Sequence, residues 1–465
     1  MSHHILTLAP TDVLFFKDGR PMEGSSSGHG AAWPLPHVLN AALHAALWRS
    51  KQDLGDLHPH RPGRSGNIHS EDRPENGRLF GSLVTAGPFP VSDSGGWLFP
   101  RPADAQAAAS PQPSLLPFQP PHAAVSSLHP GLNPVVNTKP PSKSKAEAWW
   151  DKTAFEAYLK NPDTILPAKH FHEDSSIYLA EHTVGIGTDP QTGTQDGERI
   201  YSAAYLRLKP DYKLGLVASC IDKKGGDLVA RIFPNDGTRT TILVGGQQRS
   251  GSLQRESAGP IPLPVGMSTG FSQHGGKFHV KWVLLTPAIW PEIPPGLSKR
   301  GTERKAHHGG WLPNWIDPDS LQVLLQSVNP EERRRRRSLN YAQKGYASGA
   351  NASAIAAKLV AAIVPKAQVV TGWSLGDSDD QGEATLGGAK ATHLAVPAGA
   401  VYYFECDHAE DAQALAAALN WHGPETSNFK SQISNRRSTL MGEKGFGLGI
   451  CSSWTFHHPN IPGYP

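Results

Sequence analysis

The stretch from Thr11 to Leu47 constrains the fold more than any other part of the chain. Val13 to Phe16 form a short apolar and aromatic run that predicts a buried strand. A Gly- and Ser-rich loop, Lys17 to Gly30, follows, and apolar residues recur at helical spacing from Pro36 onward. Glycines let the backbone approach an anion closely, and the free N–H groups at a helix start face it. The stretch therefore suits phosphate binding, with an ordinary surface loop as the alternative. The residues of this loop that we predict to contact phosphates are Lys17, Arg20, Ser25, Ser26, Ser27 and His29.

Length and composition favour two domains with long loops. The chain has 465 residues, more than one ordinary core accommodates, and it contains 47 Gly and 41 Pro. A net charge of +3 is too small to predict a nucleic-acid partner, so any basic surface must come from local clustering. Three widely spaced cysteines argue against a zinc ribbon or a disulfide framework. We expect a cytoplasmic protein with no membrane segment, because no long apolar run or signal-peptide pattern is present.

Short strands mixed with a few helices predict the α+β class. The apolar patterns that predict strands cover residues 5–8, 214–219, 228–233, 241–244, 278–285 and 395–405. Helical patterns cover residues 149–159 and 409–419, whereas residues 101–141 are rich in Ala and Pro and have no pattern. The rhythm near both ends predicts two ferredoxin-like halves, residues 1–210 and 211–465, with long insertions. One insertion carries the run Arg333 to Arg337, which is either a solvated helix face or a basic surface for RNA.

Two glycine motifs are candidate sites. Gly24 to Gly28 matches G-x-S-x-G, but eight residues separate the preceding strand from its serines, so a nucleophile elbow is disfavoured. Gly445 to Gly449 is followed by strand-like residues rather than a helix, which excludes a dinucleotide loop. The same loop could offer backbone N–H groups and Lys444 to a polynucleotide, with Phe446 stacking on a base. The alternative is a tight turn with Phe446 in the core. The residues predicted to bind RNA here are Lys444, Gly445, Phe446 and Gly447.

A histidine-rich segment is the best metal or acid–base candidate. His170, His172, Glu173 and Asp174 lie close together in sequence. A His-x-His pair on a strand needs a third ligand that the sequence does not supply. We therefore predict no metal site, no cofactor and no catalytic residue.

The ordered set of blocks resembles a known family. Phe16 to Pro21, the Gly/Ser loop and Trp33 to Pro36 are similar to the start of the RAMP subunit that caps the guide 5′ handle in type III-B CRISPR (Cmr) effectors. Val184–Gly187 with Glu198–Tyr201 resembles that family's GI…G-x-L-Y block, with Ile200 where Leu is usual. The match continues in the same order through further blocks. These are residues 245–249, 285–287, 396–404 and 445–447.

The resemblance implies two fused RRM-like RAMP halves that hold the 5′ handle of a guide RNA with glycine-rich and basic loops. It implies partners, namely guide RNA, the large polymerase-like subunit and a backbone RAMP subunit, and it implies no catalytic site. The further RNA-binding residues in or beside the matching blocks are Gly185, Gly187, Arg199, Arg207 and Arg249. Two alternatives stay open. One is a RAMP-type endoribonuclease that matures guide RNA with His29 or His172 as general acid or base. The other is a 5′-capping RAMP subunit of a type III-D complex.

Overall fold

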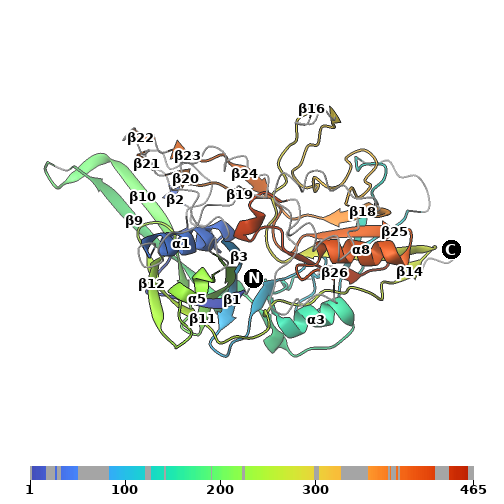
Figure 1. The fold of residues 1–465 in the computed structure, drawn as a ribbon, viewed down its shortest axis with the longest axis horizontal. Coiled ribbons are helices and arrows are strands. Elements are labelled where there is room, and N and C mark those ends of the chain that lie inside the picture. The colour runs from blue at the N-terminus through green and yellow to red at the C-terminus, as the bar shows by residue number, and fades with distance from the viewer. Residues whose placement is uncertain are drawn as a thin grey trace.

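In the computed structural model, two five-stranded sheets lie side by side, one in each half of the chain (Figure 1). It describes residues 3–16, 27–28, 33–50, 83–120, 127–140, 143–189, 191–221, 226–297, 303–325, 354–374, 377–378, 384–385, 388–424 and 439–458. Several predictions lie outside these residues, namely those for Lys17, Arg20, Ser25, Ser26, His29 and the run Arg333 to Arg337.

The first sheet is antiparallel and is covered by helix α1 (Pro36–Arg49). Its strand order is β12 (Arg239–Leu243), β13 (Ser250–Arg255), β1 (His4–Pro10), β11 (Tyr212–Ser219) and β3 (Val84–Ser92). Leu39 and Leu43 lie one helical turn apart and pack with Leu6 and Leu8, which alternate on β1. The apolar spacing of the sequence thus produces this core directly.

The second sheet is antiparallel and carries helix α8 (Ala409–Leu419). Its strands are β14 (Gln273–His274), β15 (Lys277–Leu284), β25 (Val401–Cys406) and β18 (Ala357–Ile363), and β26 (Gly449–Ser453) also pairs with β15. Four strands of the first sheet lie side by side in the order β13, β1, β11, β3. Numbered by their order along the chain, these are the fourth, first, third and second strands. Strands β15, β18, β25 and β26 repeat that order. Where the first half has α1, the second has an irregular segment with β16 (Gly296–Leu297), β17 (Glu303–Arg304) and the buried residues Trp290 and Trp315.

The structure corrects several boundaries. The first sheet crosses the boundary predicted after residue 210, because β11, β12 and β13 belong to it. Residues 228–233, predicted as a strand, begin helix α5 (Leu228–Ile232), whose N-terminus is capped by the Asp227 carboxylate accepting from the Ala230 N–H. Val13 to Phe16 are buried as predicted, but only Leu14 forms a β-bridge, with Leu206. The helix at Ala409–Leu419 is confirmed.

The Ala/Pro-rich stretch is part of the body of the protein rather than a structureless insertion. It contains β5 (Leu115–Pro117) paired with β6 (Val135–Asn137). A small sheet is formed by β4 (Leu98–Pro100), β7 (Trp149–Asp151) and β8 (Phe171–His172). In the chain, η3 (Ala168–His170) directly precedes β8, and α4 (Asp174–Ile177) follows it. Helix α3 (Lys152–Lys160) contributes Phe155 and Tyr158 to a core cluster shared by both halves.

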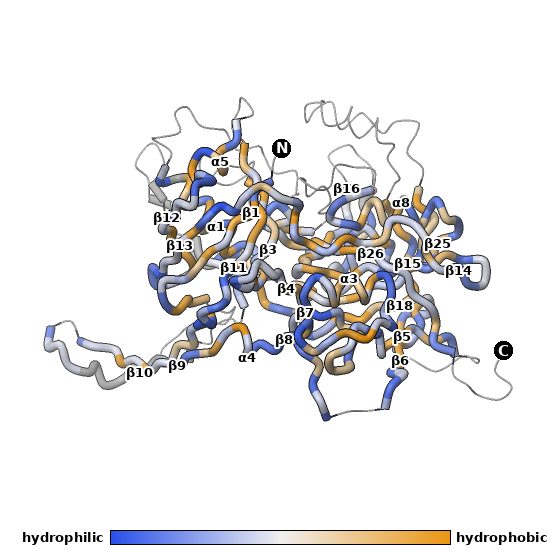
Figure 2. The backbone as a smooth tube through the Cα atoms, turned by 90° about the horizontal axis from the view of Figure 1, so that it is seen from below, coloured by the Kyte–Doolittle hydropathy of each residue, from blue (hydrophilic) through white to orange (hydrophobic). Residues whose placement is uncertain are grey.

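Two β-hairpins extend from the body, one from each half (Figure 1). The first pairs β9 (Tyr178–Thr188) with β10 (Gln195–Leu208), and the short β2 (Ser27–Gly28) runs parallel to β10. The second is a ladder of β19 (Gln368–Val370) with β24 (His393–Ala395), β20 (Trp373–Ser374) with β23 (Gly388–Ala389), and β21 (Asp377–Ser378) with β22 (Ala384–Thr385). Figure 2 shows the hydrophobic strands inside the body and the β9–β10 hairpin projecting away from it.

Candidate nucleic-acid interface

The glycine loop before the last strand packs against the start of α1. It follows η5 (Gly442–Lys444), and Gly445 and Gly447 have φ angles of 101° and 72°, which favour glycine. A Cβ on Gly445 would lie 3.0 Å from the Thr85 carbonyl oxygen and 3.3 Å from the Pro36 Cβ. A Cβ on Gly447 would lie 2.4 Å from the Thr439 Cγ2. Both glycines are therefore required by the turn and its packing.

The ring of Phe446 is a core group. Phe446 is fully buried and belongs to a small cluster with Ile289, Val370 and Leu440. Its ring stacks on His37 with 6.0 Å between centroids and 17° between planes. The prediction that Phe446 stacks on a base is therefore corrected, because no face of the ring is open to solvent. Its packing instead fixes the glycine loop to the first turn of α1.

Two lysines lie near this first turn. Burial is the largest cause that lowers the pKa of His37 to about 4, and the charges of Lys444 and Lys390 contribute to the same shift. Lys444 is the last residue of η5, which packs against α1. Lys390 is held at the root of the second hairpin, where its backbone N–H donates to the Gly372 carbonyl. Sequence reasoning missed Lys390, because nothing in its local pattern indicates that it returns to α1.

The base of the first hairpin carries a second group of charges. Arg207 on β10 pairs with Glu181 at 2.5 Å and with Asp12 at 2.9 Å. Arg249 lies 3.9 Å from Asp12, and its guanidinium is 4.9 Å from the centre of the Tyr205 ring. The hydrogen bond from Arg207 is the main cause that lowers the pKa of the exposed Asp12 carboxyl. The structure thus brings Arg207 and Arg249 together, and the carboxylates of Asp12 and Glu181 neutralise part of their positive charge.

The remaining predicted residues of the first hairpin lie farther along it. Gly185 pairs with Tyr201, and Gly187 lies two residues nearer the tip on β9. Arg199 lies within β10, in a stretch where the pairing register shifts. Ser27 pairs with Ser202 and Gly28 pairs with Ala203, so this described piece of the Gly/Ser loop lies alongside β10. Strand β2 therefore belongs to the first hairpin, whereas the glycine loop packs on the start of α1.

The histidine-rich segment is arranged for pairing and packing. The His170 Nδ1 lies 2.7 Å from the Asp151 Oδ2, and the His172 Nδ1 lies 3.5 Å from the Tyr212 hydroxyl. Burial is the main cause that lowers the pKa of His172. Within the described ranges, no three His, Cys, Asp or Glu side chains are placed to hold a metal ion. In the same ranges, no helix has the length and apolarity needed to cross a membrane.

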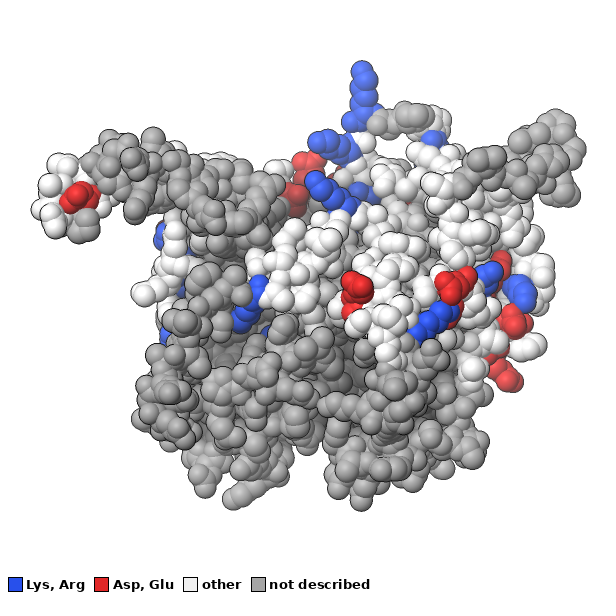
Figure 3. All heavy atoms as spheres, turned by 90° about the horizontal axis from the view of Figure 1, so that it is seen from above, with Lys and Arg blue, Asp and Glu red and all other residues white. Residues whose placement is uncertain are grey.

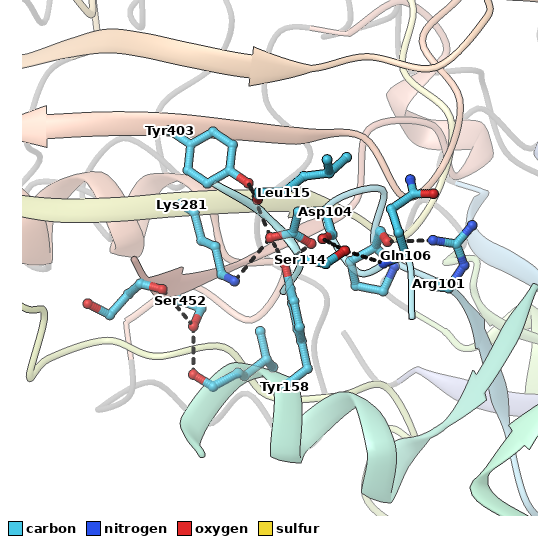
Figure 4. Close-up of polar contacts among 12 residues, drawn as sticks. Arg101, Asp104, Gln106, Ser114, Leu115, Tyr158, Lys281, Tyr403 and Ser452 are labelled. Carbon is cyan, nitrogen blue, oxygen red and sulfur yellow. Dashed lines mark hydrogen bonds and ion pairs between the residues drawn. The ribbon is translucent and has the colours of Figure 1, made fainter. Parts of the chain in front are cut away.

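A buried polar network joins the Ala/Pro-rich stretch to the second sheet (Figure 4). Asp104 accepts hydrogen bonds from the Tyr158 hydroxyl at 2.8 Å, the Tyr403 hydroxyl at 3.2 Å and the Lys281 ammonium at 3.3 Å. The Lys281 Nζ also lies 3.8 Å from the centre of the Tyr158 ring. Burial lowers the pKa of Lys281, and the Asp104 charge opposes that shift. No local sequence pattern predicts this network, because its partners are far apart in the sequence.

The visible surface has no uniform charge. On the face shown in Figure 3, acidic and basic side chains of the described residues are interspersed rather than gathered into one basic field. This agrees with the expectation from net charge that any attraction for nucleic acid is local.

The sequence profile of the family described as CRISPR-associated protein (Cas_Cmr3) matches residues 6–454. The chain belongs to this family. The resemblance to a type III-B (Cmr) subunit is thereby confirmed, and this Cas_Cmr3 chain is a subunit of a type III CRISPR effector.

Solved structures give more distant likenesses to this Cas_Cmr3 chain. A chain in the cryo-EM structure of the type III-B Cmr-beta bound to cognate target RNA is 13% identical, with a TM-score of 0.36 and 86% of each chain covered. A chain in the same assembly with target RNA and AMPPnP, state 1, is 12% identical, with a TM-score of 0.35 and the same coverage. A chain in the crystal structure of the Csm1–Csm4 cassette with AMPPNP is 10% identical, with a TM-score of 0.23, covering 65% of this chain and 84% of that one. A search of curated proteins found no match.

Proposed function

We propose that this protein is a non-catalytic RNA-binding subunit of a type III-B CRISPR effector that holds the 5′ handle of the guide RNA in antiviral defence. The observation that carries the proposal is the packing of the glycine loop and η5, which ends at Lys444, on the start of α1. The charges of Lys444 and Lys390 both act on His37 in that turn. In that turn Pro36 has no N–H and the Val38 N–H donates to the Leu35 carbonyl oxygen at 3.0 Å, so the lysines rather than the helix start would supply the attraction. Two ammonium groups beside it favour a phosphate of an irregular single strand.

The two halves are each ferredoxin-like in this proposal. The strand order fourth–first–third–second is repeated in both antiparallel sheets, with a helix after the first strand of one and before the last strand of the other. This is the arrangement expected of a β-α-β-β-α-β unit. In the second half, the irregular segment around Trp290 and Trp315 stands in place of the first helix.

In the proposed binding mode, contacts with phosphates supply affinity and do not recognise the RNA sequence. Lys444 and Lys390 would attract the sugar–phosphate backbone, which fixes position without reading bases. The first hairpin, with β2 alongside β10, would guide the strand away from α1, with Arg207 and Arg249 exchanging a carboxylate for a phosphate. The large polymerase-like subunit and a backbone RAMP subunit would dock on surfaces outside this path.

The test replaces both lysines and measures binding of a fluorescent single-stranded RNA that carries the handle. We expect Lys444→Ala with Lys390→Ala to weaken binding by about 2 kcal/mol and to reduce the salt slope by about 1.4, since each phosphate contact on a single strand contributes about 0.7. The matched control is Lys152→Ala on α3, which removes an exposed lysine paired with Glu156. Equal binding by parent, control and double variant would refute the site.

The proposal also excludes nuclease activity by this subunit. Labelled precursor RNA incubated with the purified protein should remain intact with and without divalent metal ions. Cleavage that disappears in His172→Ala or His29→Ala would instead establish the endoribonuclease.

A further inference from the structure

The exposed apolar side chains of this protein are concentrated on its two hairpins. Nine large hydrophobic residues are exposed among the described residues, and five of them lie on these hairpins. These five are Leu179, Val184 and Ile186 on the first hairpin and Val369 and Leu394 on the second. Exposed apolar groups that gather on projecting elements indicate contact with a partner.

The two hairpins occupy the same place in the two halves. The first lies between β3 and β11, which are the second and third strands of the first sheet in chain order. The second lies between β18 and β25, which are the second and third of the four strands β15, β18, β25 and β26. Both extend toward the same side of the molecule in Figure 1. The chain thus repeats one projecting element at one topological position.

The second hairpin is fixed at its root to the glycine loop. Val370 and Ala395 belong to the same buried cluster as Phe446. Successive strand residues point to opposite faces, so Val369 faces away from that cluster. Its cross-strand partner is Leu394, and directly opposite residues share a face. Val369 and Leu394 therefore form an exposed apolar pair, 42% and 58% accessible, on the face of the hairpin opposite the cluster that contains Phe446.

Positive charge flanks this pair. Lys366 precedes β19 and is exposed, and Lys390 precedes β24 and lies near His37. Apolar groups between lysines suit a single-stranded nucleic acid, whose bases offer flat apolar faces and whose phosphates offer negative charge. A purely apolar protein partner would not need the flanking lysines.

We propose that the second hairpin is an RNA-contacting arm, in which Val369 and Leu394 pack against unpaired bases of the strand whose phosphates lie at the glycine loop. This inference rests on the proposed function and adds to it a base-contacting surface in the second half of the chain. The apolar pair is sequence-tolerant, because every base has an apolar face. The pair would keep these bases unpaired without recognising their hydrogen-bonding edges.

The first test is cross-linking in the full-length protein. A photoreactive p-benzoylphenylalanine in place of Leu394 should cross-link to bound handle RNA. The same group in place of Leu324, which is equally exposed outside the hairpins, is the control. We expect a cross-linking yield about tenfold above the control. Equal yields at the two positions, or a cross-link from position 394 only to a protein subunit in the assembled complex, would overturn the inference.

The second test is the double substitution Val369→Ser with Leu394→Ser. We expect RNA affinity to fall about threefold to tenfold, on the scale of one lost stacking contact, with the thermal midpoint unchanged. Leu324→Ser should leave affinity unchanged. If the hairpin variant binds like the parent while Lys444→Ala with Lys390→Ala still weakens binding, the arm is wrong and the proposed function stands. If the lysine variants also bind like the parent, the proposed function fails.

Discussion

Two clusters of the same chemical groups lie in opposite environments. In the body, Asp104 pairs with Lys281, and the lysine lies over the ring of Tyr158. At the base of the first hairpin, Asp12 pairs with Arg207 and Arg249, and the second arginine lies over the ring of Tyr205. The Asp104 side chain is 0% exposed and the Asp12 side chain is 55% exposed.

Burial determines how much stability is lost when one partner of an ion pair is removed. In the buried cluster, removal of one partner leaves the other charge without water, so each group depends on the rest. At the exposed cluster, water and salt replace any lost partner at little cost. The first arrangement locks the Ala/Pro-rich stretch to the second sheet, and the second leaves cations that can exchange partners.

The largest expected effect comes from breaking the buried cluster. Asp104→Asn leaves the Lys281 ammonium unpaired and should lower the free energy of unfolding by about 3–5 kcal/mol, measured by urea denaturation. The double variant Asp104→Asn with Lys281→Met should lose less than the sum of the two single variants, because it removes the stranded charge. Single losses below about 1 kcal/mol would show that the cluster does not lock the two segments.

Gly447→Ala tests whether the glycine loop is a turn that the fold requires for stability. A side chain there meets Thr439 in a backbone conformation with positive φ, so the free energy of unfolding should fall by about 1–3 kcal/mol. Gly310→Ala is a matched control, since its φ is 69° and a Cβ would meet nothing within 4 Å. If the two variants are equally stable, contact with Thr439 contributes nothing.

Acid should act through buried histidines more than through exposed ones. Burial lowers the pKa of His279 to about 4, so the unfolded chain binds a proton there more readily than the folded protein. Stability linked to His279 is therefore present above pH 6.5 and is lost as the pH falls toward 4. The ring stacks on Trp454 at 4.4 Å and its Nε2 lies 3.7 Å from Glu405.

His279→Phe should keep the stacking and remove this titration. Between pH 7 and pH 5, the variant should lose on the order of 1 kcal/mol less stability than the parent. A His279→Phe curve that parallels the parent would assign the acid sensitivity to other groups.

The smallest effect is expected at the exposed cluster. Arg207→Gln should change the free energy of unfolding by less than about 1 kcal/mol, because its partners Asp12 and Glu181 are solvated. Denaturation in low and high salt would measure the change. A loss as large as that of Asp104→Asn would erase the difference between the two clusters.

Residue patterns alone were sufficient to predict the elements whose contacts are local. Helices Pro36–Arg49 and Ala409–Leu419 follow from apolar residues at helical spacing, and the α+β class follows from the mixture of helical and strand patterns. The ordered blocks were also sufficient for the family, since they are read directly from residue types.

Which groups meet depends instead on how distant segments of the chain pack together. Lys281 and Asp104 are 177 residues apart, and the Ala/Pro-rich pattern around Asp104 gives no sign of a buried charge. The packing of Phe446 on His37 and the return of Lys390 to α1 are likewise invisible in any local window. Even Leu228–Ile232, apolar enough for a strand, became helical once Asp227 capped it. Local patterns encode periodicity, whereas burial and charge pairing depend on where distant segments pack.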